Sequence, residues 1–140
     1  MADKRFVVTD ALIKADPLVS QLVTAEAGAV VTFVGVVRGN SEGRQVLHLE
    51  YEAYPEMAEA VMQQIAEEVR ARWPDVQGVA ITHRVGRLEV GETAVVIALS
   101  AAHRPSVFDA LHYTIDRVKE IVPIWKKEVW ADGSEWKSEQ

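Results

Sequence analysis

Residues 28–74 read GAVVTFVGVVRGNSEGRQVLHLEYEAYPEMAEAVMQQIAEEVRARWP, and three successive patterns in this stretch decide the fold. β-Branched residues crowd positions 28–38, which favours a buried strand over a helix. Apolar and polar residues alternate over 46–54, which predicts a strand with one face in water. Over 55–73 apolar residues recur at three- and four-residue spacing behind a leading proline, the pattern of an amphipathic helix. The helix is therefore expected to pack on a sheet.

The segments on either side extend this unit. Residues 6–8 are expected to form a short first strand, and 16–23 a short helix. Residues 79–90 and 93–100 have the composition of two further strands, joined near Gly91. Because these two segments are adjacent in sequence, they are expected to pair antiparallel.

A second amphipathic helix is predicted from Pro105 to the residue before Pro123, and residues 124–131 and 134–137 follow as strands. Antiparallel strand pairs with two main helices define an α+β domain. We therefore expect one domain over residues 1–140, with a mixed, mainly antiparallel sheet.

Two short polar stretches are expected to connect these strands. Residues 38–44, RGNSEGR, are polar and rich in glycine, which predicts a mobile surface loop. Asp132-Gly133 is a strong signal for a two-residue hairpin turn. That turn would place Glu128 opposite Lys137 across the hairpin.

Composition excludes several classes of chemistry. The chain has no cysteine, which excludes disulfides, thiol nucleophiles, cysteine-ligated metals and a persulfide carried on this chain. A formal net charge of −6 argues against general binding of nucleic acid, which needs a basic face. The longest nearly apolar run, 27–37, is shorter than the roughly 20 residues of a membrane helix, and the N-terminus lacks the apolar core of a signal peptide. We expect a cytoplasmic protein.

Standard motifs of phosphate loops, dinucleotide sites, serine hydrolases and zinc proteases are absent from the sequence. The four histidines do not have the spacing of metal ligands, so no metal site and no cofactor are predicted. The polar residues that remain of interest bracket the second helix.

His103 and Arg104 precede Pro105, where the free N–H groups and the dipole of a helix favour an anion such as phosphate. Capping and solvation of the helix explain the same two residues equally simply. Lys119 lies beside the apolar stripe near the helix end, where a partly desolvated ammonium can act as acid, base or nucleophile. A lysine in the last turn also complements the helix dipole without any further role.

Strand alternation separates the charged residues that follow. Lys126 and Glu128 are predicted to project to one side of their strand, and Lys127 to the other. A strand-face ion pair is the alternative explanation for Lys126 and Glu128. Considered by itself, Arg38 is explained as an ordinary charged residue at the point where a buried strand meets a loop.

Five segments, taken in order, resemble the catalytic large subunit of the molybdopterin synthase family. They are GAVVTFVGVVR at 28–38, LEYEAYPEM at 49–57, HRVGRL at 83–88, SAAHR at 100–104 and KEIVPIWKKE at 119–128. The resemblance implies the α/β hammerhead fold. It also implies a sulfurtransferase that converts cyclic pyranopterin monophosphate to molybdopterin by inserting two sulfur atoms.

The same resemblance implies a partner. Sulfur would arrive as a thiocarboxylate on the C-terminal Gly-Gly of a small ubiquitin-like carrier subunit. A homodimer of large subunits with one carrier at each end would form a heterotetramer.

The resemblance also assigns roles to residues. Lys119 and Lys126 would be catalytic, stabilising the oxyanions formed as sulfur is transferred and the acyl link to the carrier is hydrolysed. Substrate would be bound by the segments Val36, Val37, Arg38, then His103 and Arg104, then Lys119, and finally Lys126, Lys127 and Glu128. Family members often have a basic residue where this chain has Val36, so only the backbone is expected to make contact there.

Two other functions remain open on the residues alone. One is a non-catalytic module that binds a phosphorylated metabolite or nucleotide without turnover. The other is an enzyme in which Lys119 forms a Schiff base with a phosphorylated carbonyl compound, which borohydride would trap.

Overall fold

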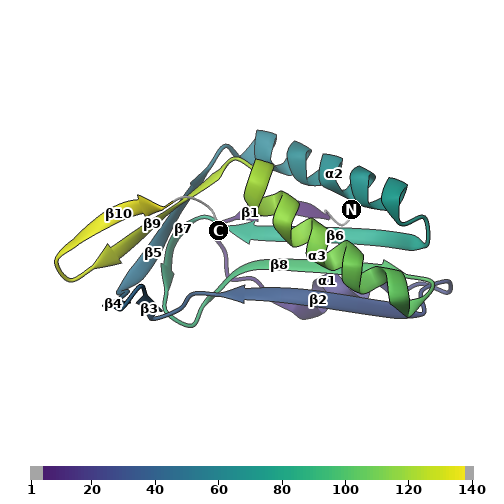
Figure 1. Ribbon diagram of the computed structural model, residues 1–140, viewed down its shortest axis with the longest axis horizontal. Coiled ribbons are helices and arrows are strands. Elements are labelled where there is room, and N and C mark those ends of the chain that lie inside the picture. Colours follow the sequence, from purple (N-terminus) through teal and green to yellow (C-terminus); the bar gives the residue numbers. More distant parts are fainter. Residues whose placement is uncertain (1–4, 138–140) are drawn as a thin grey trace.

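The computed structural model describes residues 5–137, and its strands divide between two four-stranded sheets and one small hairpin (Figure 1). The first sheet contains, in spatial order, β1 (Phe6–Thr9), β6 (Val76–Arg84), β8 (Thr93–Ala101) and β2 (Ala29–Val36). The second contains β10 (Gly133–Lys137), β9 (Ile124–Trp130), β5 (His48–Ala53) and β7 (Gly86–Glu89). The hairpin pairs β3 (Asn40–Ser41) with β4 (Arg44–Gln45). The helices are α1 (Ala15–Leu22), α2 (Pro55–Arg72) and α3 (Arg104–Ile121).

The pairing pattern confirms the predicted α+β class. β1 runs parallel to β6, and every other strand pair in the two sheets is antiparallel. α2 and α3 begin and end within a residue of the predicted limits, because a proline at the start of each helix and another beyond its end mark the boundaries.

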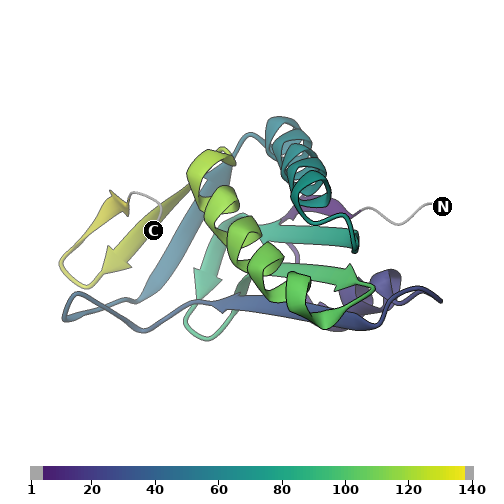
Figure 2. The same ribbon diagram turned by 45° about the vertical axis from the view of Figure 1, so that its right-hand side comes forward.

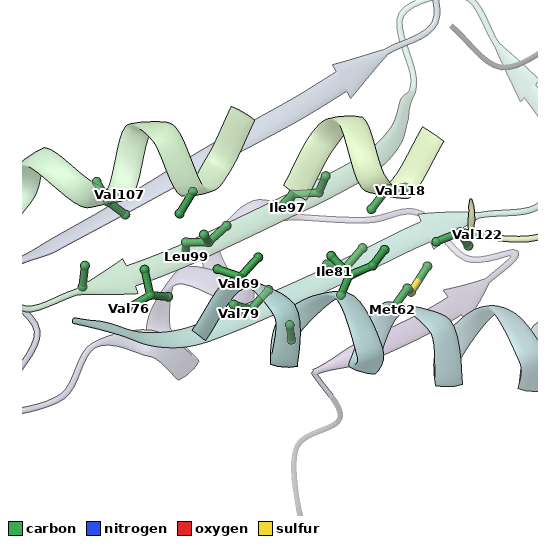
Figure 3. Close-up of a cluster of buried hydrophobic side chains, with 14 of the residues drawn as sticks. Met62, Val69, Val76, Val79, Ile81, Ile97, Leu99, Val107, Val118 and Val122 are labelled. Carbon is green, nitrogen blue, oxygen red and sulfur yellow. The ribbon is translucent and has the colours of Figure 1, made fainter. Parts of the chain in front are cut away.

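The core lies between the first sheet and the two long helices (Figures 1 and 2). Figure 3 shows Met62 and Val69 of α2 packed with strand residues such as Ile81 and Ile97. α1 covers the opposite face, where Leu22 packs on Ala80 and Ala98. The two central strands are thus buried on both faces, which explains why they are apolar almost throughout.

Residues 79–90 were predicted to form one continuous strand, and this prediction is wrong because they belong to two strands. Arg84 ends β6 in the first sheet, and Gly86, at φ +88°, begins β7 in the second. β6 pairs with β8 as expected, but β7 pairs with β5. Glycine tolerates this left-handed backbone, so one apolar run can pass from one sheet to the other.

The predicted mobile loop over 38–44 is also wrong, because this segment forms a docked hairpin. Glu42 and Gly43 both have positive φ and make its turn. The guanidinium of Arg44 lies 4.2 Å from the ring centroid of Trp130 and 3.4 Å from Asp132. The hairpin is therefore fixed against the end of β9.

The register of the last hairpin differs from the prediction by two residues. Trp130 pairs with Gly133, so Ala131 and Asp132 form the turn, and Glu128 lies opposite Glu135. Lys137 is diagonal to Glu128, at 4.0 Å between Nζ and Oε1. Gly133, which was predicted to lie in the turn, begins β10 instead, with φ +151°.

Candidate functional site

A cavity of about 450 Å³ opens where the two sheets meet the end of α3. Its polar lining side chains are Arg38, Tyr51, His83, Lys119 and Lys126. Most of the remaining wall is aliphatic, with Val95, Ile97, Ile115, Val118, Val122 and Ile124 among its members.

Three separate parts of the fold bring the cations together. Arg38 follows the end of β2, and Lys119 comes from the last turn of α3, next to the cavity-lining Val118. Lys126 projects from β9 on the same side as Ile124, as strand alternation predicted. These residues are far apart in sequence, so only tertiary structure makes them one site.

The cavity has a strongly one-sided charge. Among the described residues that line it, three are cations and none is aspartate or glutamate. Aliphatic walls exclude water and keep the local dielectric low, which strengthens the pull of these cations on an anion. The geometry therefore suits a phosphorylated ligand or an oxyanion formed during reaction.

His83 is a lining residue for which the sequence predicted no role. It follows Ile81 on the helix-covered face of β6, and its ring meets that of Tyr51 edge-on at 4.9 Å. Nδ1 lies 2.7 Å from the carbonyl oxygen of Arg84. Burial lowers the pKa of the imidazole to about 4, despite the opposing effect of that hydrogen bond. His83 is therefore neutral at physiological pH.

His103 and Arg104 do not reach this cavity within one chain. They line a separate depression at the start of β2 and of α3, together with residues such as Gly28 and Phe108. Lys119 lies sixteen positions after His103 along the helix, which corresponds to about 24 Å along the axis. The side chain of His103 makes no capping hydrogen bond to its helix.

Lys127 and Glu128 also lie outside the lining of the cavity. Lys127 Nζ is 3.3 Å from Glu50 Oε1 on the opposite face of the second sheet. The buried Glu128 carboxylate accepts a hydrogen bond from Trp130 Nε1 at 3.2 Å. Val36 lines the cavity, whereas Val37 does not and is buried in a separate cluster with Leu88.

Within residues 5–137, no group of three or more His, Asp or Glu side chains is arranged to hold a metal ion. None of the helices in that range is long and apolar enough to cross a membrane.

Comparison with known proteins gives the family. A family model described as "MoaE protein" matches residues 8–121. A molybdopterin synthase catalytic subunit from Halalkalibacterium halodurans is 49% identical over the whole of this chain and 89% of its own length. The corresponding protein of Bacillus subtilis is 44% identical over 98% of this chain and 87% of its own length.

Solved structures agree. Molybdopterin synthase from Staphylococcus aureus superposes with a TM-score of 0.93 at 42% identity, over 97% of this chain and 98% of that one. A chain in a complex of subunits 1 and 2 of the molybdopterin-converting factor from Helicobacter pylori shares the fold, with a TM-score of 0.77 at 16% identity, over 96% of this chain and 90% of that one. Both the matched length and the identity show that this chain belongs to the MoaE family, whose members include molybdopterin synthase catalytic subunits.

Proposed function

We propose that this chain is the catalytic subunit of a molybdopterin synthase and acts as a sulfurtransferase. It converts cyclic pyranopterin monophosphate to molybdopterin, with both sulfur atoms supplied by the C-terminal thiocarboxylate of a small carrier subunit. The observation that carries the proposal is the cavity in which Arg38, Lys119 and Lys126 converge and whose described lining residues include no carboxylate. Such a cavity favours a substrate that is anionic and a reaction that develops negative charge on oxygen.

The cations have distinct places in this mechanism. The thiocarboxylate sulfur attacks an electrophilic side-chain carbon of the substrate. As the carbon–sulfur bond forms, a carbon–oxygen bond at the same carbon breaks and its electron pair passes to the oxygen, so that substrate and carrier are joined as an acyl thioester. Water then adds to the acyl carbon, the bond between that carbon and sulfur breaks, and the carrier leaves as a carboxylate. Lys119 and Lys126 stabilise the oxyanion of the tetrahedral intermediate, and Arg38 binds the phosphate.

A carrier tail needs access to this cavity, and the Helicobacter pylori structure is itself a complex of two converting-factor subunits. We propose the same kind of partner for this chain, a small protein with a flexible Gly-Gly terminus. The absence of cysteine is consistent with sulfur delivered on another chain. A cytoplasmic location remains a prediction.

The position of His103 and Arg104 is reconciled with a substrate role if two copies of the chain associate along β2. β2 is one of the two edge strands of the first sheet and exposes Val34 by 42% and Val36 by 51%. Two β2 strands placed side by side about a twofold axis run antiparallel, so the start of one lies beside the end of the other. His103 and Arg104 of a second copy then approach the cavity that contains Arg38 and Lys119.

Reconstitution tests the function. The purified chain is mixed with thiocarboxylated carrier and cyclic pyranopterin monophosphate, and molybdopterin is measured. We expect product with the wild-type chain and a loss of at least about a hundredfold with Lys119→Ala, since one oxyanion-stabilising group is worth that much. Normal turnover by Lys119→Ala would contradict the mechanism. Binding of substrate without any turnover would favour the non-catalytic module, and borohydride trapping at Lys119 would favour a Schiff base.

A further inference from the structure

The wall of the cavity contains a hydrogen-bond acceptor, on His83, that has no role in the sulfur-transfer mechanism described above. His83 lies on β6 opposite Val95 of β8, and both side chains line the cavity. Only 6% of His83 is exposed, so the accessible part of its ring meets the cavity rather than bulk solvent.

The hydrogen bond of His83 fixes which nitrogen is available. Nδ1 lies 2.7 Å from the Arg84 carbonyl oxygen, which can only accept, so Nδ1 carries the proton. In a neutral imidazole, Nε2 is then an acceptor. Nε2 makes no hydrogen bond to any residue in the described range 5–137. The ring therefore offers an acceptor of fixed orientation.

Side-chain acceptors are scarce on this wall. The charged lining residues Arg38, Lys119 and Lys126 only donate, and the described lining contains no carboxylate. The Tyr51 hydroxyl both donates and accepts, and it has interactions of its own. A pterin ring carries several N–H groups, and a buried N–H without an acceptor weakens binding.

We propose that His83 is a specificity-determining residue that binds the pterin ring by accepting a hydrogen bond from one of its N–H groups. This inference rests on the proposed function for the identity of the ligand. The cations hold the phosphate and the developing oxyanions, whereas His83 recognises the heterocycle. The cavity thereby distinguishes a pterin phosphate from a phosphorylated compound that lacks N–H donors.

The test separates ring recognition from phosphate binding. Cyclic pyranopterin monophosphate and inorganic phosphate are each titrated by calorimetry into the wild-type chain and three variants. His83→Phe keeps an aromatic side chain but removes both ring nitrogens and with them the acceptor, while His83→Gln keeps an acceptor oxygen. Thr82→Val is the matched control, because Thr82 is equally buried on the same strand but faces away from the cavity.

We expect His83→Phe to weaken binding of the pyranopterin about tenfold, which corresponds to the loss of one buried neutral hydrogen bond. The affinity for phosphate should stay within about twofold of the wild-type value. His83→Gln should recover most of the affinity, and Thr82→Val should change neither ligand. Unchanged pyranopterin affinity in His83→Phe overturns the inference. An equal loss for phosphate also overturns it, because the effect then belongs to the whole cavity.

Turnover with thiocarboxylated carrier distinguishes this inference from the proposed function. His83→Phe should raise KM about tenfold with kcat nearly unchanged, and a fall in kcat at constant KM contradicts a binding role. If the wild-type chain binds the pyranopterin but forms no product, the proposed function fails while the binding result still decides the role of His83. If His83→Phe does not fold, nitrogen-15 NMR of the wild-type chain decides instead. Pyranopterin, but not phosphate, must shift the His83 Nε2 resonance, and no shift overturns the inference.

Discussion

The ion pair between α2 and α3 makes a testable contribution to stability that depends on pH. The Glu68 carboxylate accepts hydrogen bonds from Arg117 Nε at 2.9 Å and Nη2 at 3.0 Å, and from the Tyr113 hydroxyl at 2.7 Å. Arg117 and, next, Tyr113 lower the pKa of Glu68 from its ordinary 4.5 to about 2. Lys119 is two residues beyond Arg117, so this contact also holds the helix end that faces the cavity.

The magnitude follows from linkage between protonation and folding. A pKa that is about 2 in the folded chain and 4.5 in the unfolded chain corresponds to an upper limit of about 3 kcal/mol for the stabilisation of the folded chain. Glu68 and Arg117 remain about a quarter exposed, so solvent screening reduces this to about 1–2 kcal/mol. Because the folded pKa is depressed, the stabilisation is complete above about pH 4.5 and is lost as the pH falls toward 2.

Urea unfolding of wild-type and Glu68→Gln chains at pH 7 and at pH 3 measures this contribution. At pH 7 the variant should be less stable by about 1–2 kcal/mol. The difference should shrink at pH 3, because the Glu68 carboxylate then takes up a proton in the unfolded chain while it remains mostly ionised in the folded chain. Glu67→Gln is the control, since Glu67 is the exposed neighbour on the same helix. Equal effects of the two substitutions at pH 7, or a difference that does not change with pH, would refute the reasoning.

Three further outcomes are expected. Lys127→Ala should retain turnover within about threefold, in contrast to Lys119→Ala, because Lys127 pairs with a carboxylate on the far face of its sheet. If Lys127→Ala lost as much activity as Lys119→Ala in the reconstituted assay, Lys127 would have a part in the reaction. Lys119→Ala chains and Arg104→Ala chains are mixed in equal amounts and allowed to exchange subunits. If each cavity uses residues of both copies, about a quarter of the sites should regain activity, because half of the dimers are mixed and one of their two sites has both residues intact. No recovery in that mixture, with heterodimers verified by mass spectrometry, would show that the copies do not share sites. Arg44→Ala should speed proteolysis of the β3–β4 hairpin several-fold, because the contact of Arg44 with Trp130 is lost; an unchanged cleavage rate would contradict the docking of the hairpin.

The sequence predicted helices better than it predicted the partition of strands. Prolines near the ends of α2 and α3 act locally, so their boundaries could be found without knowledge of the fold. The change of sheet at Gly86 depends instead on which strands are available to pair, and an uninterrupted apolar run hides it. Likewise, the two-residue error in the last hairpin arose because Asp132-Gly133 suggested a turn one residue beyond the observed one.

Some residues of the candidate site could be predicted from the sequence and others could not, again because local patterns do not show which distant segments meet. Arg38, Lys119 and Lys126 were selected through resemblance to a family, since no local pattern indicates that three distant segments meet. Alternation along β9 did predict that Lys126 and Lys127 diverge, because it is a local property of any strand. His83 had no local signal, as its burial depends on the strands and rings that surround it.

The passage of the chain from one sheet to the other at Gly86 has a consequence for cooperativity. The cavity takes Arg38 and His83 from segments of the first sheet and Lys126 from the second. A ligand that contacts both sides therefore adds a tether between two layers that are already joined by connecting segments, by the small cluster around Leu88 and by Ile124 of β9 in the main core. Occupancy of the cavity should slow hydrogen exchange in β5 and β9 together with β2, so that the bound chain opens as one unit.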